Sequence, residues 1–425
     1  MIPRSVRLFA LATAVAGAAC ARPDPMNQIA EDYVKLVLAV GEHDADYVDA
    51  YYGPSEWREA VKAQSMEPAT LHGRADVLLA RLADVPPPRD SLERLRLEYL
   101  TTQLGAVRAR IGMLLGQHLA FDDEARALYD VTPPAYPEGH FQAALAALDS
   151  ALPGRGSVQD RVERYRARFV IPPDRVDGVF ARAIGECRTR TSRYLALPEE
   201  ERFTVEYVRD QPWSGYNWYQ GDATSLIQVN TDLPMHIDRA VDLACHEGYP
   251  GHHVYNVLLE THLVRDRGWI EYTVYPLFSP QSLIAEGSAN YGIAMAFPGD
   301  ERVAFERDVL FPLAGLDPAE AARYYDIQEL IGGLDYAGNE AARRYLDGAF
   351  TAAAAAQWLT TYALMSPERA AQRLRFIDRY RSYVINYNLG RDLVAAYVER
   401  EATEDRRWAV FGALLGSPRL PAGLR

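Results

Sequence analysis

The segment His246–His253, with the sequence His-Glu-Gly-Tyr-Pro-Gly-His-His, constrains the chain more than any other. It places three of the nine histidines and one glutamate within eight residues. Imidazole and carboxylate groups at such short spacing are typical metal ligands. Proline cannot continue a helix without losing a backbone hydrogen bond, and glycine accepts backbone angles that other residues avoid. The segment therefore predicts a helix that carries metal ligands and is interrupted at Pro250-Gly251.

The spacing looks like the zinc-hydrolase signature His-Glu-x-x-His with two residues inserted. In that signature two histidines four apart share one helix face and bind Zn²⁺, and the glutamate is the general base. On an ideal helix, at about 100° per residue, neither His252 nor His253 could share a metal with His246. We expect a bulge or kink that returns His252 toward His246, with His253 as the competing ligand. The alternative is a histidine-rich surface helix that the proline ends.

A third ligand is expected at Glu286. This carboxylate follows an apolar run, and the small residues Gly287-Ser288-Ala289 come next. Small side chains let another helix approach closely, and a glutamate on an apolar helix is rarely buried without a partner. A metal is the expected partner, and a salt bridge to an arginine is the alternative. Asn290 is a candidate hydrogen-bond partner for one of the ligand histidines.

These residues together predict a zinc-dependent hydrolase. With His246, His252 and Glu286 on Zn²⁺, an open position holds a water of lowered pKa, and Glu247 takes its proton during attack on a carbonyl. Hydrolysis of peptide (amide) bonds is the best-matched reaction. The alternative is an exported lipoprotein that binds peptide or metal without catalysis. Glu247 argues against that alternative, because a binding protein needs no base.

Two strings, Ala244–His253 and Ala285–Ala289, resemble the bacterial family called domain of unknown function 885. The similarity extends to Trp213–Gly221 and Tyr383–Gly390 and runs through most of the mature chain. That family is grouped with the glutamate-zincin (gluzincin) metallopeptidases. The resemblance implies a mainly α fold with a small β-sheet, zincin-like and similar to the carboxypeptidase Taq and angiotensin-converting-enzyme types. Those relatives carry an unbroken His-Glu-x-x-His, which this chain lacks.

Residues 21–425 are expected to form one large, mostly helical domain. Amphipathic helical patterns, broken at proline and glycine clusters, fill most of it. Phe203–Val208 alternates with a period of two and Ser225–Asn230 is bounded by turn residues, so we expect a small sheet at about 203–232. A metal-bearing helix should follow at about 235–260. A chain with 48% hydrophobic and 24% charged residues fits a folded enzyme.

The resemblance also suggests how a peptide is held. In zincins a sheet edge beside the metal helix pairs with the bound peptide, so Gln228 and Asn230 are candidates to line the groove, with a structural hairpin as the alternative. The helical relatives use a tyrosine to stabilise the oxyanion of the intermediate. Tyr387 is the candidate here. On a continuous helix it shares one face with Tyr380 and Tyr383, at spacings of three and four residues, and aromatic stripes of this kind usually belong to the core. Arg381 and Arg391 could bind a peptide's terminal carboxylate, or form solvated salt bridges instead.

The N-terminus predicts export. Two arginines precede the apolar run Leu8–Ala19, which is too short to span a membrane and fits a secretory signal. Gly17–Cys20 resembles a bacterial lipobox, so residues 1–20 are interpreted as a lipoprotein signal peptide with Cys20 lipidated. Ordinary cleavage after an Ala-x-Ala-like site is the alternative. We therefore expect a periplasmic or outer-membrane lipoprotein that touches the membrane only through its N-terminal lipid anchor.

Charge and cysteine content limit the partners and the covalent links. The net charge of −13, from 58 acidic and 45 basic residues, repels polyphosphates, so nucleic acid is excluded as a partner. Besides Cys20 the chain has Cys187 and Cys245. An exported compartment permits a disulfide between them, although buried packing of Cys245 is the favoured interpretation.

Overall fold

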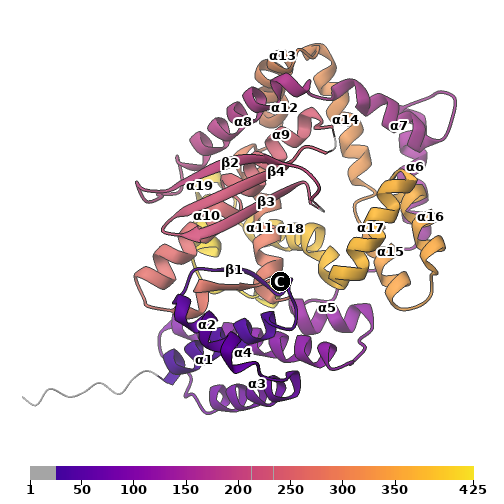
Figure 1. Cartoon of the computed structure of the whole chain (residues 1–425). Coiled ribbons are helices and arrows are strands. Elements are labelled where there is room, and N and C mark those ends of the chain that lie inside the picture. Colours follow the sequence, from indigo (N-terminus) through magenta and orange to yellow (C-terminus); the bar gives the residue numbers. More distant parts are fainter. Residues whose placement is uncertain (1–24, 212, 233) are drawn as a thin grey trace, which may run out of the picture.

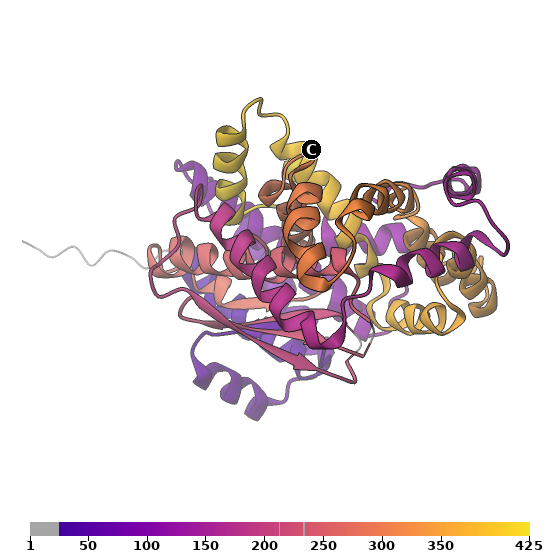
Figure 2. The same cartoon turned by 90° about the horizontal axis from the view of Figure 1, so that it is seen from above.

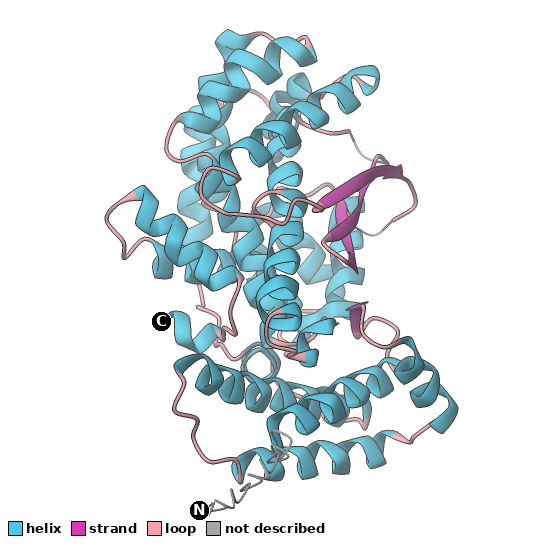
Figure 3. Ribbon diagram, turned by 90° about the vertical axis from the view of Figure 1, so that its left-hand side faces the viewer, coloured by secondary structure: helices cyan, strands magenta, loops and turns pink. Residues whose placement is uncertain are grey.

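The computed structural model describes residues 25–211, 213–232 and 234–425. Helices account for most of this part of the chain, and two small sheets complete it (Figures 1 and 3). The mainly α fold with a small β-sheet that the sequence predicts is thus confirmed. The expected signal peptide and Cys20 lie outside the described residues.

The first helices form a layer at the bottom of Figure 1. They are α1 (Pro25–Gly41), α2 (Ser55–Gln64), α3 (Pro68–Ala83), α4 (Ser91–Leu114) and α5 (Phe121–Tyr129). Helix α1 packs against both α3 and α4 and buries most of its apolar residues there. Strand β1 (Val48–Tyr51) leaves this layer and pairs antiparallel with β5 (Val274–Pro276). This two-stranded sheet joins the N-terminal layer to the centre of the molecule.

Three helices lead to the main sheet. They are α6 (Glu138–Ala151), α7 (Val158–Arg166) and α8 (Val176–Thr191). The sheet consists of β2 (Arg202–Val208), β3 (Gly215–Gly221) and β4 (Thr224–Asn230), and it begins one residue before the expected range of about 203–232. Its order is β2-β4-β3, with β4 parallel to β2 and antiparallel to β3. The sheet lies on the outside of the helical body (Figures 2 and 3).

Alternation along β4 fixes which face of the sheet is covered. Ser225, Ile227 and Val229 are buried, whereas the residues between them are partly exposed. Successive side chains of a strand point to opposite faces, so one face packs on the helices and the other faces solvent. On β3, Trp218 is 44% exposed on the outside.

The predicted metal helix at 235–260 is divided in two. Helix α9 (Ile237–Leu243) continues into one wide turn of π type (Ala244–Gly248), and α10 (His252–Leu259) begins after a short break. Helix α11 (Pro280–Ala296), which is almost wholly buried, crosses α18 (Ile385–Val398) at the centre of the molecule.

The crossing of α11 and α18 depends on two glycines. A Cβ on Gly287 would lie 2.4 Å from the carbonyl carbon of Gly390, a distance that no side chain can occupy. The small residues after Glu286 therefore allow the close approach of α11 and α18 that the sequence predicts. Glu286 itself is buried.

The C-terminal half completes the helical body. The remaining helices are α12 (Glu301–Phe305), α13 (Phe311–Ala314), α14 (Ala321–Gly332), α15 (Ala337–Leu346), α16 (Ala352–Tyr362), α17 (Pro367–Tyr380) and α19 (Glu404–Leu415). Helices α15, α16 and α17 gather beside α6 on the right of Figure 1. None of the helices in the described ranges has both the length and the apolar character needed to cross a bilayer.

Candidate metal centre

The break between α9 and α10 lies at Tyr249-Pro250-Gly251. The Tyr249 N–H donates to the Ala244 carbonyl at 3.2 Å, and the Gly251 N–H donates to the Cys245 carbonyl at 2.9 Å. These bonds span five and six residues instead of the four of an α-helix. A Cβ on Gly251 would lie 1.8 Å from the His246 carbonyl oxygen, so the turn requires glycine. The predicted bulge at Pro250-Gly251 is therefore present.

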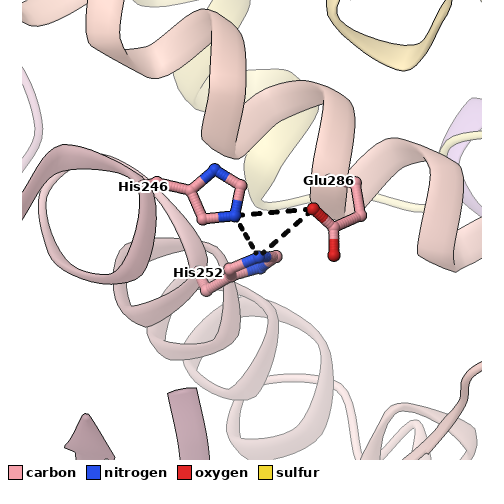
Figure 4. A group of neighbouring side chains, drawn as sticks. All are labelled: His246, His252 and Glu286. Carbon is pink, nitrogen blue, oxygen red and sulfur yellow. Dashed lines mark hydrogen bonds and ion pairs between the residues drawn. The ribbon is translucent and has the colours of Figure 1, made fainter. Parts of the chain in front are cut away.

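The bulge brings His252 back to His246, and Glu286 completes a triangle with them (Figure 4). The two Nε2 atoms are 3.1 Å apart, and Glu286 Oε2 lies 3.4 Å from His246 Nε2 and 3.9 Å from His252 Nε2. In a tetrahedral zinc site with bonds of about 2.0–2.1 Å, the ligand atoms are about 3.3–3.4 Å apart. The triangle therefore has the size that one face of such a site requires.

Glu286 offers a carboxylate oxygen that the protein itself does not satisfy. The residue is 7% exposed. Its Oε1 accepts a hydrogen bond from the Tyr383 hydroxyl at 2.8 Å, whereas its Oε2 is buried without a hydrogen-bond partner. Oε2 lies 3.4 and 3.9 Å from the Nε2 atoms of the two imidazoles. A buried charged oxygen without a hydrogen bond is destabilising, and a cation bound in the triangle removes that cost.

The protonation states of His252 and Glu286 suit a metal. Burial acts to lower the pKa of His246, but its hydrogen bond to Glu286 and the charges of Glu247 and Glu286 outweigh burial and raise that pKa. Burial favours the neutral form of His252 and lowers its pKa to about 4, with the charge of His246 acting in the same direction. Neutral imidazole is the form that binds metal. Burial disfavours ionisation of Glu286, but its interactions with His246, His252 and Tyr383 outweigh burial, so its pKa lies below the ordinary value.

His253 has a different environment, although it is the next residue along the chain. It is fully buried, its Nδ1 lies 2.9 Å from Ser225 Oγ, and its Nε2 lies 2.9 Å from Glu201 Oε2. Both ring nitrogens are thus engaged by the protein. The structure brings His252 into the triangle and leaves His253 outside it.

Glu247 lies between the first histidine and the edge of the sheet. It is 4% exposed, and its backbone carbonyl accepts a hydrogen bond from Asn217 Nδ2 at 2.8 Å. A Cβ on Gly215 would lie 2.7 Å from Glu247 Oε1, so the start of β3 passes directly beside this carboxylate. Burial raises the pKa of Glu247 to about 7; the charge of Glu286 acts in the same direction, and that of His246 opposes it.

Two tyrosines of the C-terminal region adjoin the triangle. The rings of Tyr383 and Tyr387 are 5.7 Å apart, and the Tyr383 hydroxyl is committed to Glu286. The Tyr387 hydroxyl makes no hydrogen bond within the described part of the chain. Burial raises the pKa of Tyr387 well above its ordinary value, with the nearby Glu286 adding to the effect, so the phenol keeps its proton.

Gln228 and Asn230 do not lie at a sheet edge, so the prediction that they pair there with a peptide is wrong. Strand β4 is central, with β2 on one side and β3 on the other, so its backbone has no free edge for a peptide. The side chains of both residues are hydrogen-bonded to neighbouring residues of the sheet and its loop. Strand order cannot be read from the positions of strands along a chain. The edge strand beside Glu247 is β3.

The two candidate carboxylate-binding arginines are already paired. Arg381 Nε donates to the buried carboxylate of Glu124 at 2.6 Å, and Arg391 forms ion pairs with Asp335 and Asp392 at 3.1 and 3.0 Å. The salt bridges weighed as the alternative are thus what the structure shows for both arginines.

Asn290 does not have the expected role either. Its Nδ2 donates to the backbone carbonyls of Glu286 and Tyr387, at 3.0 and 3.2 Å. The amide therefore joins α11 to α18 and does not orient a histidine.

Arg373 on α17, which the sequence does not single out, interacts electrostatically with Tyr387. Its Nε is buried without a hydrogen-bond partner, and within the described ranges no carboxylate pairs with its guanidinium, which lies 4.8 Å from the Phe376 ring centroid. Burial lowers its pKa, and its charge acts on Tyr387. No local pattern marks it among the many arginines of the chain. Its lack of a partner is visible only after folding.

The N-terminal layer also reaches this region. Asp49 of β1 accepts a hydrogen bond from the Tyr216 hydroxyl of β3. Burial raises the pKa of Asp49 to about 7, opposed by that hydrogen bond and increased by the charge of Glu286. The surroundings of the triangle are therefore built from the first layer, the sheet and the central helices together.

Cys187 of α8 and Cys245 form a disulfide, with Cα atoms 5.7 Å apart. The interpretation of Cys245 as free, buried packing is therefore wrong. The two cysteines are 58 residues apart, and nothing local in the sequence indicates that α8 packs against the turn that carries Cys245. The disulfide fixes the residue directly before His246 to a neighbouring helix.

Comparisons with known proteins place the fold. No protein-family model and no curated protein matches the sequence. Among solved structures, the chain is similar to a protein from Colwellia psychrerythraea described as a lipoprotein, with 14% identity and a TM-score of 0.52 over 87% of this chain and 68% of that one. At this identity the likeness shows a shared fold alone.

Two further solved structures are more distant. One is described as a lipoprotein of unknown function from Shewanella oneidensis, with 12% identity and a TM-score of 0.48 over 94% of this chain and 81% of that one. The other is metallocarboxypeptidase 1 of Trypanosoma cruzi, with 12% identity and a TM-score of 0.46 over 92% of this chain and 89% of that one.

Proposed function

We propose that this protein is a zinc-dependent hydrolase of peptide bonds with a zincin-like site. The observation that carries the proposal is the triangle of His246, His252 and Glu286, with a buried carboxylate, Glu247, directly after the first ligand. Two imidazoles and one carboxylate form the ligand set of catalytic zinc sites that keep a fourth position open. A structural zinc site needs no general base.

The residues present fit zinc better than a harder cation. Two of the three ligand atoms are imidazole nitrogens, which suit zinc, whereas calcium and magnesium prefer oxygen. Zinc bound by His246, His252 and Glu286 would supply a water of lowered pKa and would polarise the substrate carbonyl.

The protein's own residues complete the chemistry. Glu247 takes the proton of the attacking water and passes it to the leaving amine. Tyr387 donates its free hydroxyl to the oxyanion of the tetrahedral intermediate. Tyr383 holds Glu286 in place through its hydrogen bond.

The substrate is a peptide held between the sheet and the C-terminal helices. The edge of β3 beside Glu247 offers backbone groups for strand addition. Arg373, which has no acidic partner in the described structure, binds the terminal carboxylate of the peptide. This role replaces the one first considered for Arg381 and Arg391.

The protein acts outside the cytoplasm as a lipoprotein anchored through Cys20. Gly17–Cys20 supports this proposal, and so does the disulfide, because disulfides persist in oxidising compartments. The Colwellia protein that shares the fold is also described as a lipoprotein.

The proposal is tested by exchanging Glu247 for glutamine. Glu247→Gln keeps the size of the side chain but cannot accept a proton, and general-base assistance is worth about 10²–10⁴-fold. We expect the variant to bind one zinc per chain, as the parent does, and to cleave a mixed peptide library at least about 100-fold more slowly by mass spectrometry.

Two outcomes would contradict the proposal. A parent that binds no transition metal on elemental analysis, even after zinc is added, would remove the metal centre. A parent that binds zinc but cleaves no peptide or amide would favour the second function, a lipoprotein that binds peptide or metal without catalysis.

A further inference from the structure

The break in the motif helix raises a question of how His252 is held. In an unbroken helix, backbone hydrogen bonds between residues four apart fix the second histidine relative to the first. Here Pro250 has no N–H to donate and the backbone leaves the helical path before His252. The two wide backbone hydrogen bonds of the bulge return His252 toward His246, and side-chain contacts from outside the helix can add to them in fixing its position.

The two residues that flank the segment Pro250–His252 bind the same carboxylate oxygen. Glu201 Oε2 accepts hydrogen bonds from the Tyr249 hydroxyl at 2.7 Å and from His253 Nε2 at 2.9 Å. A carboxylate can only accept here, so the His253 proton lies on Nε2 and its Nδ1 accepts from the Ser225 hydroxyl. One carboxylate oxygen thus binds the residues on both sides of the segment Pro250–His252.

Glu201 is itself held rigidly. Its side chain is 2% exposed, and Arg188 of α8 donates to its other oxygen, Oε1. Arg188 follows Cys187, whose disulfide fixes Cys245 next to His246. The hydrogen bonds, chiefly those of His253, Tyr249 and Arg188, outweigh burial and lower the pKa of Glu201 to about 2.

Aromatic packing makes the arrangement stiff. The Phe203 ring contacts both the Tyr249 ring and the His253 ring, with centroids 5.2 Å apart in each case. Tyr249 and His253 also meet edge to face at 5.4 Å. A shift of either hydrogen-bond donor would disturb the other.

We infer that Glu201 is the positioning residue for the metal centre: by binding Tyr249 and His253 together, it sets the distance between His246 and His252. This inference rests on the proposed zinc site, and it adds a residue that contacts neither metal nor substrate. Outer partners that orient metal ligands typically change metal affinity by about 10- to 100-fold when removed.

The test compares Glu201→Gln with Glu260→Gln. Glu260 is a matched control, because it is a 5% exposed glutamate that accepts hydrogen bonds from a tyrosine, Tyr219, and an arginine, Arg265, at the far end of α10. Zinc affinity is measured by competition with a chelating dye. We expect Glu201→Gln to weaken zinc binding by about 10- to 100-fold and Glu260→Gln to change it by less than about threefold, even if both variants melt at lower temperature.

A second variant keeps the inference testable if Glu201→Gln does not fold. Tyr249→Phe removes one of the two hydrogen bonds to Oε2 and keeps the ring. It should weaken zinc binding in the same direction, by about tenfold. Unchanged affinity in both variants, or an equal loss in Glu260→Gln, would overturn the inference.

A readout without metal separates this inference from the proposed function. In metal-free protein, the backbone N–H groups of residues 246–249 and 251–253 should exchange with deuterium faster in Glu201→Gln than in the parent or in Glu260→Gln. If the parent binds zinc but cleaves nothing, the affinity comparison still decides the role of Glu201. If the parent binds no zinc, the exchange comparison decides it, and equal exchange rates would overturn the inference.

Discussion

His252 and His253 are adjacent in the sequence, yet their surroundings give them opposite roles. His252 faces another imidazole and the unsatisfied oxygen of Glu286, whereas His253 has both nitrogens occupied by Ser225 and Glu201. The first is available to a metal and the second is part of the support.

Alanine at each position should separate these roles. His252→Ala removes a ligand, so we expect zinc binding at micromolar concentration to be lost. His253→Ala keeps all three ligands and removes one hydrogen bond to Glu201, so zinc affinity should fall by only about 10- to 100-fold. Calorimetric titration with zinc measures the affinity of each variant. Loss of binding in His253→Ala with binding retained in His252→Ala would reverse the assignment.

Arg373 gives a prediction about the substrate. A hydrogen bond to a charged group is worth about 1.5–3 kcal/mol, or roughly 10- to 150-fold. Arg373→Met should therefore lower kcat/KM by about that factor for peptides with a free C-terminal carboxylate. The same variant should change cleavage of C-terminally amidated peptides much less.

Arg375 provides the control for this comparison, because it lies two residues further along α17 and is exposed. Arg375→Met should leave both kinds of peptide unaffected. An equal loss for free and amidated peptides in Arg373→Met would show that this arginine acts on the fold and not on the carboxylate.

The residues that could be predicted from the sequence are those with a local signal. His246, Glu247 and His252 share one short motif, and Glu286 stands out as a carboxylate in an apolar run. Glu201 and Tyr383 have no such signal, because each acquires its role through a partner far away along the chain. Arg373 has none because its lack of an acidic partner in the described structure appears only after folding. For Glu201 that partner is 52 residues distant.

At the scale of elements, the insert at Pro250-Gly251 is the decisive departure from a regular helix. The bend was predictable from the chemistry of proline and glycine, whereas the order of the three strands was not. The pair β1 and β5 was also not foreseen, because strands of four and three residues are too short to show an alternating pattern.

Gly251→Ala tests the bend directly. The added Cβ would lie 1.8 Å from the His246 carbonyl oxygen, so the backbone must move and the two histidines must separate. We expect zinc binding to be lost and the melting temperature to fall. Gly185→Ala, in the interior of α8 with nothing within 4 Å of the new Cβ, is the control and should stabilise the helix by about 0.5–1 kcal/mol. Normal zinc binding by Gly251→Ala would show that the bend tolerates a side chain.

At the scale of the whole molecule, the site depends on segments that are distant in sequence. The β1–β5 pair connects the N-terminal layer to the centre, α8 reaches the motif through a disulfide, and α18 crosses α11 behind Glu286. Loosening one of these connections should therefore affect both stability and the metal centre.

The disulfide between Cys187 and Cys245 allows that coupling to be measured. Closing a loop across a sequence separation of 58 residues lowers the entropy of the unfolded chain, and such a link typically stabilises a protein by roughly 2–4 kcal/mol. Reduction, or Cys187→Ala with Cys245→Ala, should lower the free energy of unfolding by that amount in urea titrations. Because Cys245 precedes His246 and Arg188 follows Cys187, the reduced protein should also bind zinc more weakly.

The double variant should show no further change on adding reductant. Identical unfolding of oxidised and reduced parent would mean that the two cysteines are not joined in solution.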